Sequence, residues 1–379
     1  MKKIIYISHY DNMYGANRAL LELMKGVKAS GLYEPVAVLP AEGEFTDVLK
    51  SQCISYIICG ITPWAAIYRE AISFGLKRRK RLASIDREIE YLHERLKDED
   101  IAFIHSNSSI IGHGAILSER LGCRHIWHIR EFAREHYGMV FFYPEEWVER
   151  YFTAADRLVA ISDAVKDNYE RSYPEAKVTR IYDGIKTVDD IGNSKAENAV
   201  TEFLYTAYIF PAKRQMDVLL AAKMLLKKGV RDFHITFAGD GDKAYLKKLK
   251  AFVKRNSLES FADFAGFVSD IKPYLKKADT GIIASEYEGF GLVTCEYMQY
   301  ALPVIGRRSG ATPEIIEDGI SGFLYDDING LAEAMEKLIR DKDLRSALGE
   351  SGRMRVLKEF TDERNVTEIL KLYGEVENG

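Results

Sequence analysis

The sequence predicts an α/β protein built from two doubly wound parallel-sheet domains. Short runs of β-branched and aliphatic residues alternate with amphipathic helical stretches, and the whole alternation occurs twice. A length of 379 residues agrees with two domains at roughly 150 residues each. The polar stretch DGIKTVDDIGNSKAENA, residues 183–199, lacks periodicity and divides the two patterns. We therefore expect domains at 1–182 and 183–356.

Each half supplies five candidate strands, in chain order. In the first half they are Lys3–Ser8, Pro35–Leu39, Ile101–His105, Arg124–Ile129 and Arg157–Ile161. In the second half they are Glu202–Ala207, His234–Gly239, Phe261–Phe264, Thr280–Ser285 and Leu302–Ile305. A helix is expected over Thr361–Tyr373, because Val366, Ile369 and Tyr373 fall on one stripe.

The composition is that of an average globular protein, with 47% hydrophobic and 29% charged residues. The net charge of −4 provides no general basic field for nucleic acid. The four cysteines show no C-x-x-C spacing, so reduced thiols and a cytoplasmic location are expected. The N-terminal apolar run predicts a strand rather than a signal peptide, and no run approaches the roughly 18 apolar residues of a membrane span.

One stretch, residues 64–82, has the pattern of a basic amphipathic helix. Thr62-Pro63 is a favourable helix start, and Trp64 and the apolar residues after it fall mostly on one face. Five consecutive cations follow at residues 77–81. Such a helix can lie on an anionic membrane surface, or it can pack on the first sheet with a solvated cationic end. Both interpretations stay open, so the location is cytoplasmic with a peripheral membrane contact as one alternative.

The stretch 280–326 carries the strongest indication of chemistry. A strand ends at Ser285, a glycine-containing loop follows, and a helix begins near Gly291. The amide groups at a helix N-terminus form a site for phosphate. Glu288 precedes this helix, and Glu296 lies about a turn and a half inside it. The two carboxylates could therefore reach hydroxyl groups on both sides of a bound diphosphate, as in a nucleoside diphosphate-sugar.

The motif EYEGFGLVTCEYMQYALPVI, followed by GATPEII and GISGFLY, resembles the E-x7-E region of retaining GT-B glycosyltransferases of family 4. Other motifs resemble the same family in the same order, namely YGANRALLEL, VAISDAVKDNY, IYDGI, FAGDGDKAYLKKL, FAGFVSDIKPYLKKAD and FTDERNVTEILKLY. The resemblance covers nearly the whole chain. It implies the GT-B fold, in which two Rossmann-like domains face each other across a cleft and a C-terminal helix, here 357–379, returns to the first domain.

The resemblance also implies roles for particular residues. Glu288 would contact hydroxyl groups of the donor sugar, and Lys213, in YIFPAKRQMD, would neutralise the leaving diphosphate. His128, in HIWHIRE, would form a hydrogen bond near the donor sugar. These three form the expected catalytic set. The expected donor-binding residues are Gly15, Arg214, Gly239, Phe290, Gly291, Leu292 and Glu296.

The chain departs from the family pattern at two places. Ala207-Tyr208-Ile209 stands where the family has Gly-Arg-Leu, so the usual phosphate-binding arginine is replaced by Tyr208. Arg214 is the nearest substitute in sequence. Glu131, after Arg130, is also unlike the family. The first departure keeps open a nucleotide-sugar binding protein with weak or no transfer, and a GT-B-type nucleotide-sugar epimerase is a second alternative.

Three other site types fit short stretches of the sequence less well. Residues 239–244 satisfy G-x-G-x-x-A, but they lie in mid-chain and their Asp240 and Asp242 would repel a pyrophosphate. The same two acids resemble a metal pair but are more typical of a turn. His125 and His128, with Cys123, lie on a strand whose alternation sends the two histidines to opposite faces, which disfavours zinc.

The sequence therefore predicts a retaining, metal-independent glycosyltransferase with no cofactor beyond its nucleotide-sugar donor. The family favours a UDP-sugar over a GDP-sugar. The expected acceptor is a saccharide or a lipid-linked saccharide, in assembly of bacterial surface polysaccharide or glycolipid. No nucleic-acid partner is expected.

Overall fold

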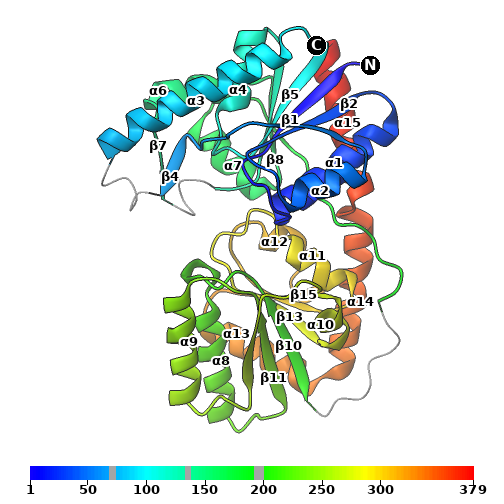
Figure 1. Cartoon of the computed structure of the whole chain (residues 1–379). Coiled ribbons are helices and arrows are strands. Elements are labelled where there is room, and N and C mark those ends of the chain that lie inside the picture. The colour runs from blue at the N-terminus through cyan, green and yellow to red at the C-terminus, as the bar shows by residue number, and fades with distance from the viewer. Residues whose placement is uncertain (68–73, 133–137, 192–199) are drawn as a thin grey trace. The chain divides into compact units, whose positions relative to one another are not determined.

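The computed structural model describes residues 1–67, 74–132, 138–191 and 200–379 (Figure 1). The chain divides into two compact units. Unit 1 contains Met1–Gly184 together with Asp362–Gly379, and unit 2 is Ile185–Thr361. The expected boundaries, at 182 and 357, lie a few residues from these. The prediction of two doubly wound parallel sheets is confirmed.

Unit 1 contains a seven-stranded sheet whose order is β3-β2-β1-β5-β6-β8-β9. All neighbouring pairs in this sheet are parallel. The strands are β1 (Lys3–Ile7), β2 (Glu34–Leu39), β3 (Ser55–Ile58), β5 (Ile101–Asn107), β6 (Arg124–Ile129), β8 (Arg157–Ala160) and β9 (Val178–Arg180). The sequence analysis missed β3 and β9, which are short strands at the two edges of the sheet.

Helices α1 (Gly15–Ser30), α2 (Glu44–Ser51) and α15 (Asp362–Asn378) cover one face of this sheet. In α1, the buried residues Leu20, Leu23, Met24 and Val27 recur at helical spacing, and the helix ends at Gly31 in the left-handed conformation. From α15, Ile369, Leu372, Tyr373 and Val376 enter the same core. The helix predicted at the C-terminus therefore exists and belongs to unit 1.

The other face of the sheet carries α3 (Phe74–Leu96), α4 (His113–Leu121), α6 (Glu145–Ala154) and α7 (Asp163–Ser172). Helix α4 packs on β5 and β6, and α3 packs on α4. Trp127 of β6 stacks on Phe152 of α6 at 4.3 Å between ring centroids, and Phe152 also touches Tyr169 of α7.

The helix predicted to begin at Thr62-Pro63 is wrong at its start. Ala65–Ile67 forms strand β4, which pairs antiparallel with β7 (Met139–Phe141). Trp64 is fully buried, and its indole N–H donates to the Ser109 carbonyl at 2.8 Å. The apolar side chain that began the expected helix thus belongs to the core, and aromatic packing overrides the local helix signal. Residues 68–73 of the predicted helix lie outside the described residues.

Unit 2 contains a six-stranded parallel sheet with the order β12-β11-β10-β13-β14-β15. Its strands are β10 (Thr201–Thr206), β11 (Phe233–Ala238), β12 (Ala262–Gly266), β13 (Thr280–Ile283), β14 (Val304–Arg307) and β15 (Gly322–Tyr325). Its helices are η2 (Pro211–Lys213), α8 (Gln215–Lys227), α9 (Lys243–Arg255), α10 (Lys272–Lys277), α11 (Leu292–Gln299), α12 (Thr312–Ile315), α13 (Ile328–Arg340) and α14 (Lys342–Glu359). Strand β15 was not predicted.

Both sheets change direction at their centre. In unit 2 the chain moves outward from β10 to β11 and β12, then returns to β13 on the other side of β10. In unit 1 the same change occurs between β1 and β5. In doubly wound sheets, ligands bind outside the carboxyl ends of the strands at this switch point. Within the described residues, no helix combines the length and apolar character needed to cross a membrane.

Candidate active site

The switch point of unit 2 brings two of the predicted catalytic residues into contact. Lys213 follows β10 and Glu288 follows β13, and these are the two central strands. The Lys213 ammonium donates to Glu288 Oε2 at 3.1 Å. Both side chains remain partly exposed, at 23% and 21%. Residues separated by 75 positions in sequence thus meet where the fold provides a ligand site.

The backbone around Lys213 turns sharply. Pro211–Lys213 forms a single 3-10 turn, and Arg214 has a positive φ of 56°. The Tyr205 hydroxyl, from β10, donates to the Lys213 carbonyl and holds this turn on the sheet. The turn orients Lys213 and Arg214 differently, so that they pair with different carboxylates.

Arg214 lies in a network of charges at the same sheet edge. Its guanidinium is 3.0 Å from Glu286 and 3.8 Å from Asp217, and Arg307 is 3.7 Å from the same Asp217 oxygen. Burial raises the pKa of Asp217, and the two arginines oppose that change. Three cations (Lys213, Arg214 and Arg307) lie beside three carboxylates (Glu286, Asp217 and Glu288), so their formal charges cancel. A bound anion could pair with these cations in place of the acids.

Sequence reasoning missed Arg307, Asp217 and Glu286. Arg307 is the last residue of β14, but the sequence analysis ended that strand at Ile305 and so left Arg307 in a loop. The rule that ligands lie at carboxyl ends of parallel strands, applied to a strand two residues longer, would have selected it. Asp217 and Glu286 carried no sequence signal beyond their neighbourhood to Lys213 and Glu288.

The N-terminus of α11 has the predicted local structure. Gly291 has a φ of 111°, which favours glycine, and α11 begins at Leu292. Phe290 is buried and fixes the loop before the helix. Backbone N–H groups in the first turn of a helix have no partner within the helix, so this end can bind an anion. Glu296 lies half-buried on α11, one turn beyond Leu292.

A neighbouring segment supports the loop that carries Glu288. The Ala311 N–H donates to the Glu288 carbonyl at 2.9 Å, and the Ser309 hydroxyl donates to the Glu286 carbonyl. Gly310 has a φ of 56°, and a Cβ there would lie 2.7 Å from the Glu288 nitrogen. The segment around Gly310, which belongs to the GATPEII motif, therefore holds the backbone of the loop that carries Glu288.

Gly239, at the end of β11, is required by close packing. Its φ is 143°, and an added Cβ would collide with the Ala207 carbonyl oxygen. Gly241 packs in the same way on Ile209, with which it forms a β-bridge. Asp242 accepts the Tyr245 N–H at 2.6 Å and caps α9. These contacts explain the glycines and the acid without a dinucleotide or a metal.

The position of the usual family arginine is solvent-accessible. Tyr208 is 59% exposed and lies beside Phe210, which is 40% exposed, with ring centroids 6.4 Å apart. An aromatic pair thus occupies the end of the β10 loop.

In unit 1, the carboxyl edge of the sheet holds His128, Arg130 and Asp183. His128 is fully buried at the end of β6, and its Nδ1 is hydrogen-bonded to His105 Nε2 at 3.2 Å. Burial, followed by the charge of Arg130, holds the pKa of His128 well below its usual range. The Arg130 guanidinium donates to both Asp183 oxygens, at 2.6 and 2.5 Å, and to Asn107 Oδ1 at 2.6 Å.

Glu131, the second departure from the family, has a structural role. It accepts hydrogen bonds from the Ser109 N–H at 2.6 Å and from the hydroxyls of Ser108 and Ser109. Ser108 has a φ of 141°, which is strained for a residue with a side chain. The carboxylate holds this unusual turn at the end of β5.

Gly15, the remaining predicted residue, is the exposed first residue of α1. The preceding loop is fixed by Asn17, whose side-chain amide donates to the carbonyls of Tyr10 and Asn12. Asn17 Oδ1 also accepts from the Ser8 hydroxyl at 2.6 Å. Asn17 was not predicted, because a buried asparagine inside a helix has no distinctive pattern.

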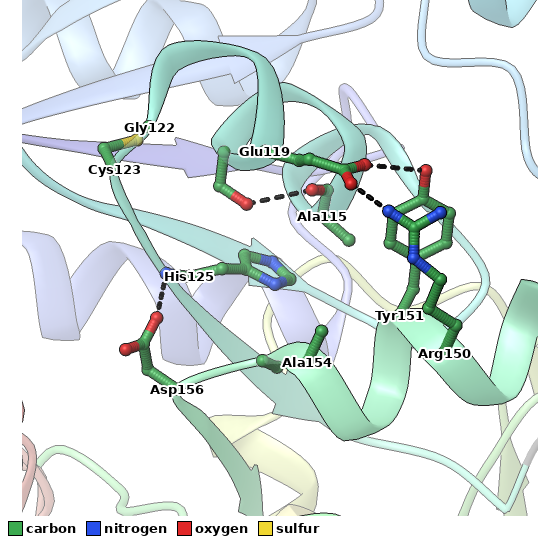
Figure 2. A pocket seen from close by; sticks show the side chains of 11 residues that line it. Ala115, Glu119, Gly122, Cys123, His125, Arg150, Tyr151, Ala154 and Asp156 are labelled. Carbon is green, nitrogen blue, oxygen red and sulfur yellow. Dashed lines mark hydrogen bonds and ion pairs between the residues drawn. The ribbon is translucent and has the colours of Figure 1, made fainter.

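A pocket of about 280 Å³ lies at the opposite edge of the unit 1 sheet, where β6 and β8 begin (Figure 2). His125 projects into it between α4 and α6, and its Nε2 pairs with Ser106 at 2.9 Å. His125 and His128 thus point to opposite faces of the sheet, as expected from strand alternation, which argues against a shared zinc ion. None of the predicted site residues lines this pocket.

Comparison with known proteins agrees with this architecture. Residues 13–189 match the family described as Glycosyltransferase Family 4, and residues 190–355 match Glycosyl transferases group 1. An uncharacterized glycosyltransferase of Methanocaldococcus jannaschii is 26% identical over 294 residues, which cover 74% of this chain and 77% of that protein. N-acetyl-alpha-D-glucosaminyl L-malate synthase of Bacillus anthracis is 27% identical over 59% of this chain and 60% of its own length.

A solved structure of similar fold is that of Anabaena HepE in complex with UDP and glucose. It superposes with a TM-score of 0.79 at 18% identity, covering 99% of this chain and 100% of that one. The two matched families account together for residues 13–355, which is most of the chain. The chain is therefore a glycosyltransferase of family 4 with the GT-B fold.

Proposed function

We propose that this protein transfers a sugar from a nucleoside diphosphate-sugar, UDP-sugar in preference to GDP-sugar, to an acceptor hydroxyl with retention of anomeric configuration. The observation that carries the proposal is the Lys213–Glu288 contact at the switch point of unit 2, next to the amide end of α11. Anabaena HepE, which shares the fold, was solved with UDP and glucose. A cation and a helix N-terminus together suit a diphosphate leaving group.

In the proposed reaction, the bond between the anomeric carbon and the diphosphate oxygen breaks, and its electron pair goes to the diphosphate. The acceptor hydroxyl oxygen bonds to the anomeric carbon on the face that the diphosphate leaves. Its proton passes to a diphosphate oxygen. The transfer is proposed to need no metal ion, because protein groups stabilise the charge on the diphosphate. Lys213 and the first amides of α11 stabilise the charge that develops on the diphosphate, while Glu288 accepts hydrogen bonds from sugar hydroxyls.

The test is a panel of UDP- and GDP-sugars scored by thermal shift, because a ligand that binds the folded state raises its stability. Donors that bind are then incubated with saccharide acceptors in the presence of EDTA. Nucleoside diphosphate release, and a product whose anomeric configuration by NMR matches that of the donor, support the proposal. An inverted linkage, or a requirement for metal, contradicts it.

The second candidate is a nucleotide-sugar binding protein with weak transfer, and Tyr208 in place of the arginine favours it. Tyrosine has no cationic group, so Tyr208 supplies no positive charge to a diphosphate at that position. Under this alternative, donors produce a thermal shift without release of nucleoside diphosphate. A free nucleotide-sugar of altered configuration would instead indicate the epimerase. The variant Tyr208→Arg should raise turnover if the missing cation limits it.

We also propose that the acceptor is lipid-linked, in assembly of surface polysaccharide or glycolipid, and that part of the 64–82 stretch contacts an anionic membrane. Arg79 and Lys80, at the beginning of α3, are exposed. Trp64 takes no part because it is buried. Arg78 donates to the Phe142 carbonyl at 2.6 Å, and Arg81 lies over the Phe142 ring, so these two cations pack on unit 1.

Co-sedimentation with anionic liposomes tests this contact. The double variant Arg79→Gln/Lys80→Gln should lose binding, since each cation contributes about 1 kcal/mol at an anionic surface. The matched control is Lys247→Gln/Lys248→Gln, which removes two exposed cations from α9 in unit 2. Equal binding by both variants and the unmodified chain would argue against a membrane contact at α3.

A further inference from the structure

A buried chain of hydrogen bonds crosses the core of unit 1 and ends at His128. The Tyr6 hydroxyl of β1 pairs with the Tyr373 hydroxyl of α15 at 3.1 Å, and Tyr373 pairs with His105 Nδ1 at 2.7 Å. His105 Nε2 then pairs with His128 Nδ1 at 3.2 Å. All four side chains have no exposed surface. The chain therefore links the C-terminal helix to the predicted catalytic histidine.

The two histidines in this chain of hydrogen bonds, His105 and His128, are neutral imidazoles. Burial, followed by the nearby positive charge of Arg130, holds the pKa of His105 and of His128 well below the usual range. A neutral imidazole has one nitrogen that donates and one that accepts. Donation along the chain must therefore run in one direction throughout, either from Tyr6 toward His128 or from His128 toward Tyr6.

The far end of the chain favours donation toward His128. Tyr373 is the one hydrogen-bond partner of the Tyr6 hydroxyl among the described residues. If donation ran outward from His128, the Tyr6 proton would have no acceptor in an apolar core. An unpaired buried donor disfavours a state by about tenfold or more. If donation runs inward, Tyr6 donates to Tyr373, Tyr373 to His105, and His105 Nε2–H to His128 Nδ1.

The near end of the chain is compatible with the same direction. Among the residues that the structure describes, His128 Nε2 has no hydrogen-bond partner, and Asp183 Oδ1 lies 3.9 Å from it. The Asp183 carboxylate attracts an N–H, but it is also paired with Arg130, so the far end of the chain decides the direction. With inward donation, Nε2 carries the hydrogen. With outward donation, a lone pair would face Asp183 while the Tyr6 proton stayed unpaired.

We propose that Tyr6, Tyr373 and His105 hold the buried His128 in the Nε2–H tautomer. His105 and Tyr373 are then positioning residues that act through His128. Because Nε2 already carries a hydrogen, His128 cannot accept a proton there as a general base. This tautomer does not depend on the proposed function.

The tautomer is measured directly by two-bond proton–nitrogen correlation spectra of the full chain labelled with 15N-histidine, without substrate. His128→Gln identifies the His128 signals. We expect the pattern of the Nε2–H tautomer, in at least about tenfold excess. An Nδ1–H pattern for His128 in the unmodified protein overturns the proposal whether or not the protein transfers sugar.

Three variants test the direction of the chain. His105→Gln can donate its amide N–H to His128 and accept from Tyr373, so it should keep the Nε2–H pattern. His105→Glu offers a carboxylate, an acceptor, and should convert His128 to Nδ1–H at pH 8. Tyr6→Phe should keep the wild-type pattern, because the Tyr373 proton still needs His105 as its acceptor. An unchanged tautomer in a folded His105→Glu protein contradicts the role of His105.

Activity separates positioning from a merely structural effect. If His128 takes part in the proposed transfer, His105→Glu should lower kcat/KM by about tenfold, while His105→Gln should restore it to near the wild-type value. Circular dichroism and thermal unfolding report whether each variant folds. If His105→Glu does not fold, the spectra of the unmodified protein and of His105→Gln still decide the assignment. Loss of activity in His105→Gln with an unchanged tautomer would refute the link between the two.

Discussion

The ammonium group of Lys213 and the carboxylate of Glu288 form an ion pair at 3.1 Å, between the ends of the two central strands of unit 2. Each side chain is thus held in place by the other without a ligand. In the proposed reaction, a bound diphosphate replaces Glu288 as the partner of the Lys213 ammonium group. The Glu288 carboxylate can then accept hydrogen bonds from sugar hydroxyls. Partly exposed ion pairs contribute about 0–1 kcal/mol, so this pair adds little to the stability of unit 2.

Lys213→Ala should lower kcat by about 10² to 10³, the usual loss when one charge-stabilising donor is removed. The melting temperature should change little. Lys228→Ala is the matched control, because it removes another lysine of unit 2 that is paired with a carboxylate, Glu336 at 2.9 Å. Turnover in Lys213→Ala equal to that of the control would show that the site is assigned wrongly.

Gly239→Ala should destabilise unit 2 by about 2–4 kcal/mol, because a positive φ and a collision with the Ala207 carbonyl act together. Gly229→Ala is the control: it also has a positive φ, of 83°, but open space around the added methyl group, so about 1 kcal/mol is expected. Urea unfolding measures both. A similar loss in the two variants would mean that the Ala207 loop moves aside freely.

Asp362→Asn should raise the free energy of unfolding at neutral and alkaline pH. Burial, then the charges of Glu22, Glu363 and Asp183, raise the pKa of Asp362 to about 7 in the folded protein, against 3.8 as the ordinary value. Between those two values the folded state keeps a proton that the unfolded state has lost, so stability falls as pH rises. Above pH 7 both the folded and the unfolded state have lost this proton, so the loss of stability that Asp362 causes no longer grows with pH.

The advantage of Asp362→Asn should therefore be absent near pH 3.5, grow from about pH 4 to 7, and stay constant at higher pH. Thermal unfolding at several pH values measures it. Glu375→Gln is the control, because it removes an exposed acid from the same helix more than three turns beyond Asp362. A stability difference that does not depend on pH would contradict the raised pKa.

Glu131→Ala should destabilise unit 1 by about 1–3 kcal/mol, because the Ser109 N–H and two serine hydroxyls lose their acceptor in a buried turn. Glu119→Ala, which removes an exposed carboxylate paired with Arg150, should cost less than about 1 kcal/mol. Chemical denaturation measures the free energy of unfolding of both variants. If the two losses are equal, the strained turn at Ser108 does not depend on Glu131.

The central strands were predictable, because buried parallel strands consist of continuous apolar runs that local pattern detects. The edge strands β3, β9 and β15 were missed, since short half-exposed strands lack that signal. The helix expected from Thr62 failed for a different reason. The ring centroids of Trp64 and Trp127 lie 5.4 Å apart. This contact between residues 63 positions apart in sequence decides the local conformation.

In the candidate site too, local sequence patterns do not reveal contacts between distant segments. Motifs identified Lys213 and Glu288, whose spacing in sequence belongs to a known family. The partners of His128 were not predicted, because Tyr6, His105 and Tyr373 come together only when three distant segments fold. Arg307 and Asp217 were not predicted for a similar reason, since their ion pair depends on which strands are neighbours in the sheet.

Unit 1 is built from both ends of the chain, with α15 completing the core formed by residues 1–184. During synthesis, the first 184 residues leave the ribosome long before the residues that cover their sheet. Until residues 362–379 are synthesised, the apolar surface that receives Ile369, Leu372 and Val376 lacks the cover that α15 provides. A message cut short before codon 362 would therefore yield a polypeptide with a persistently exposed core, which chaperones and proteases recognise.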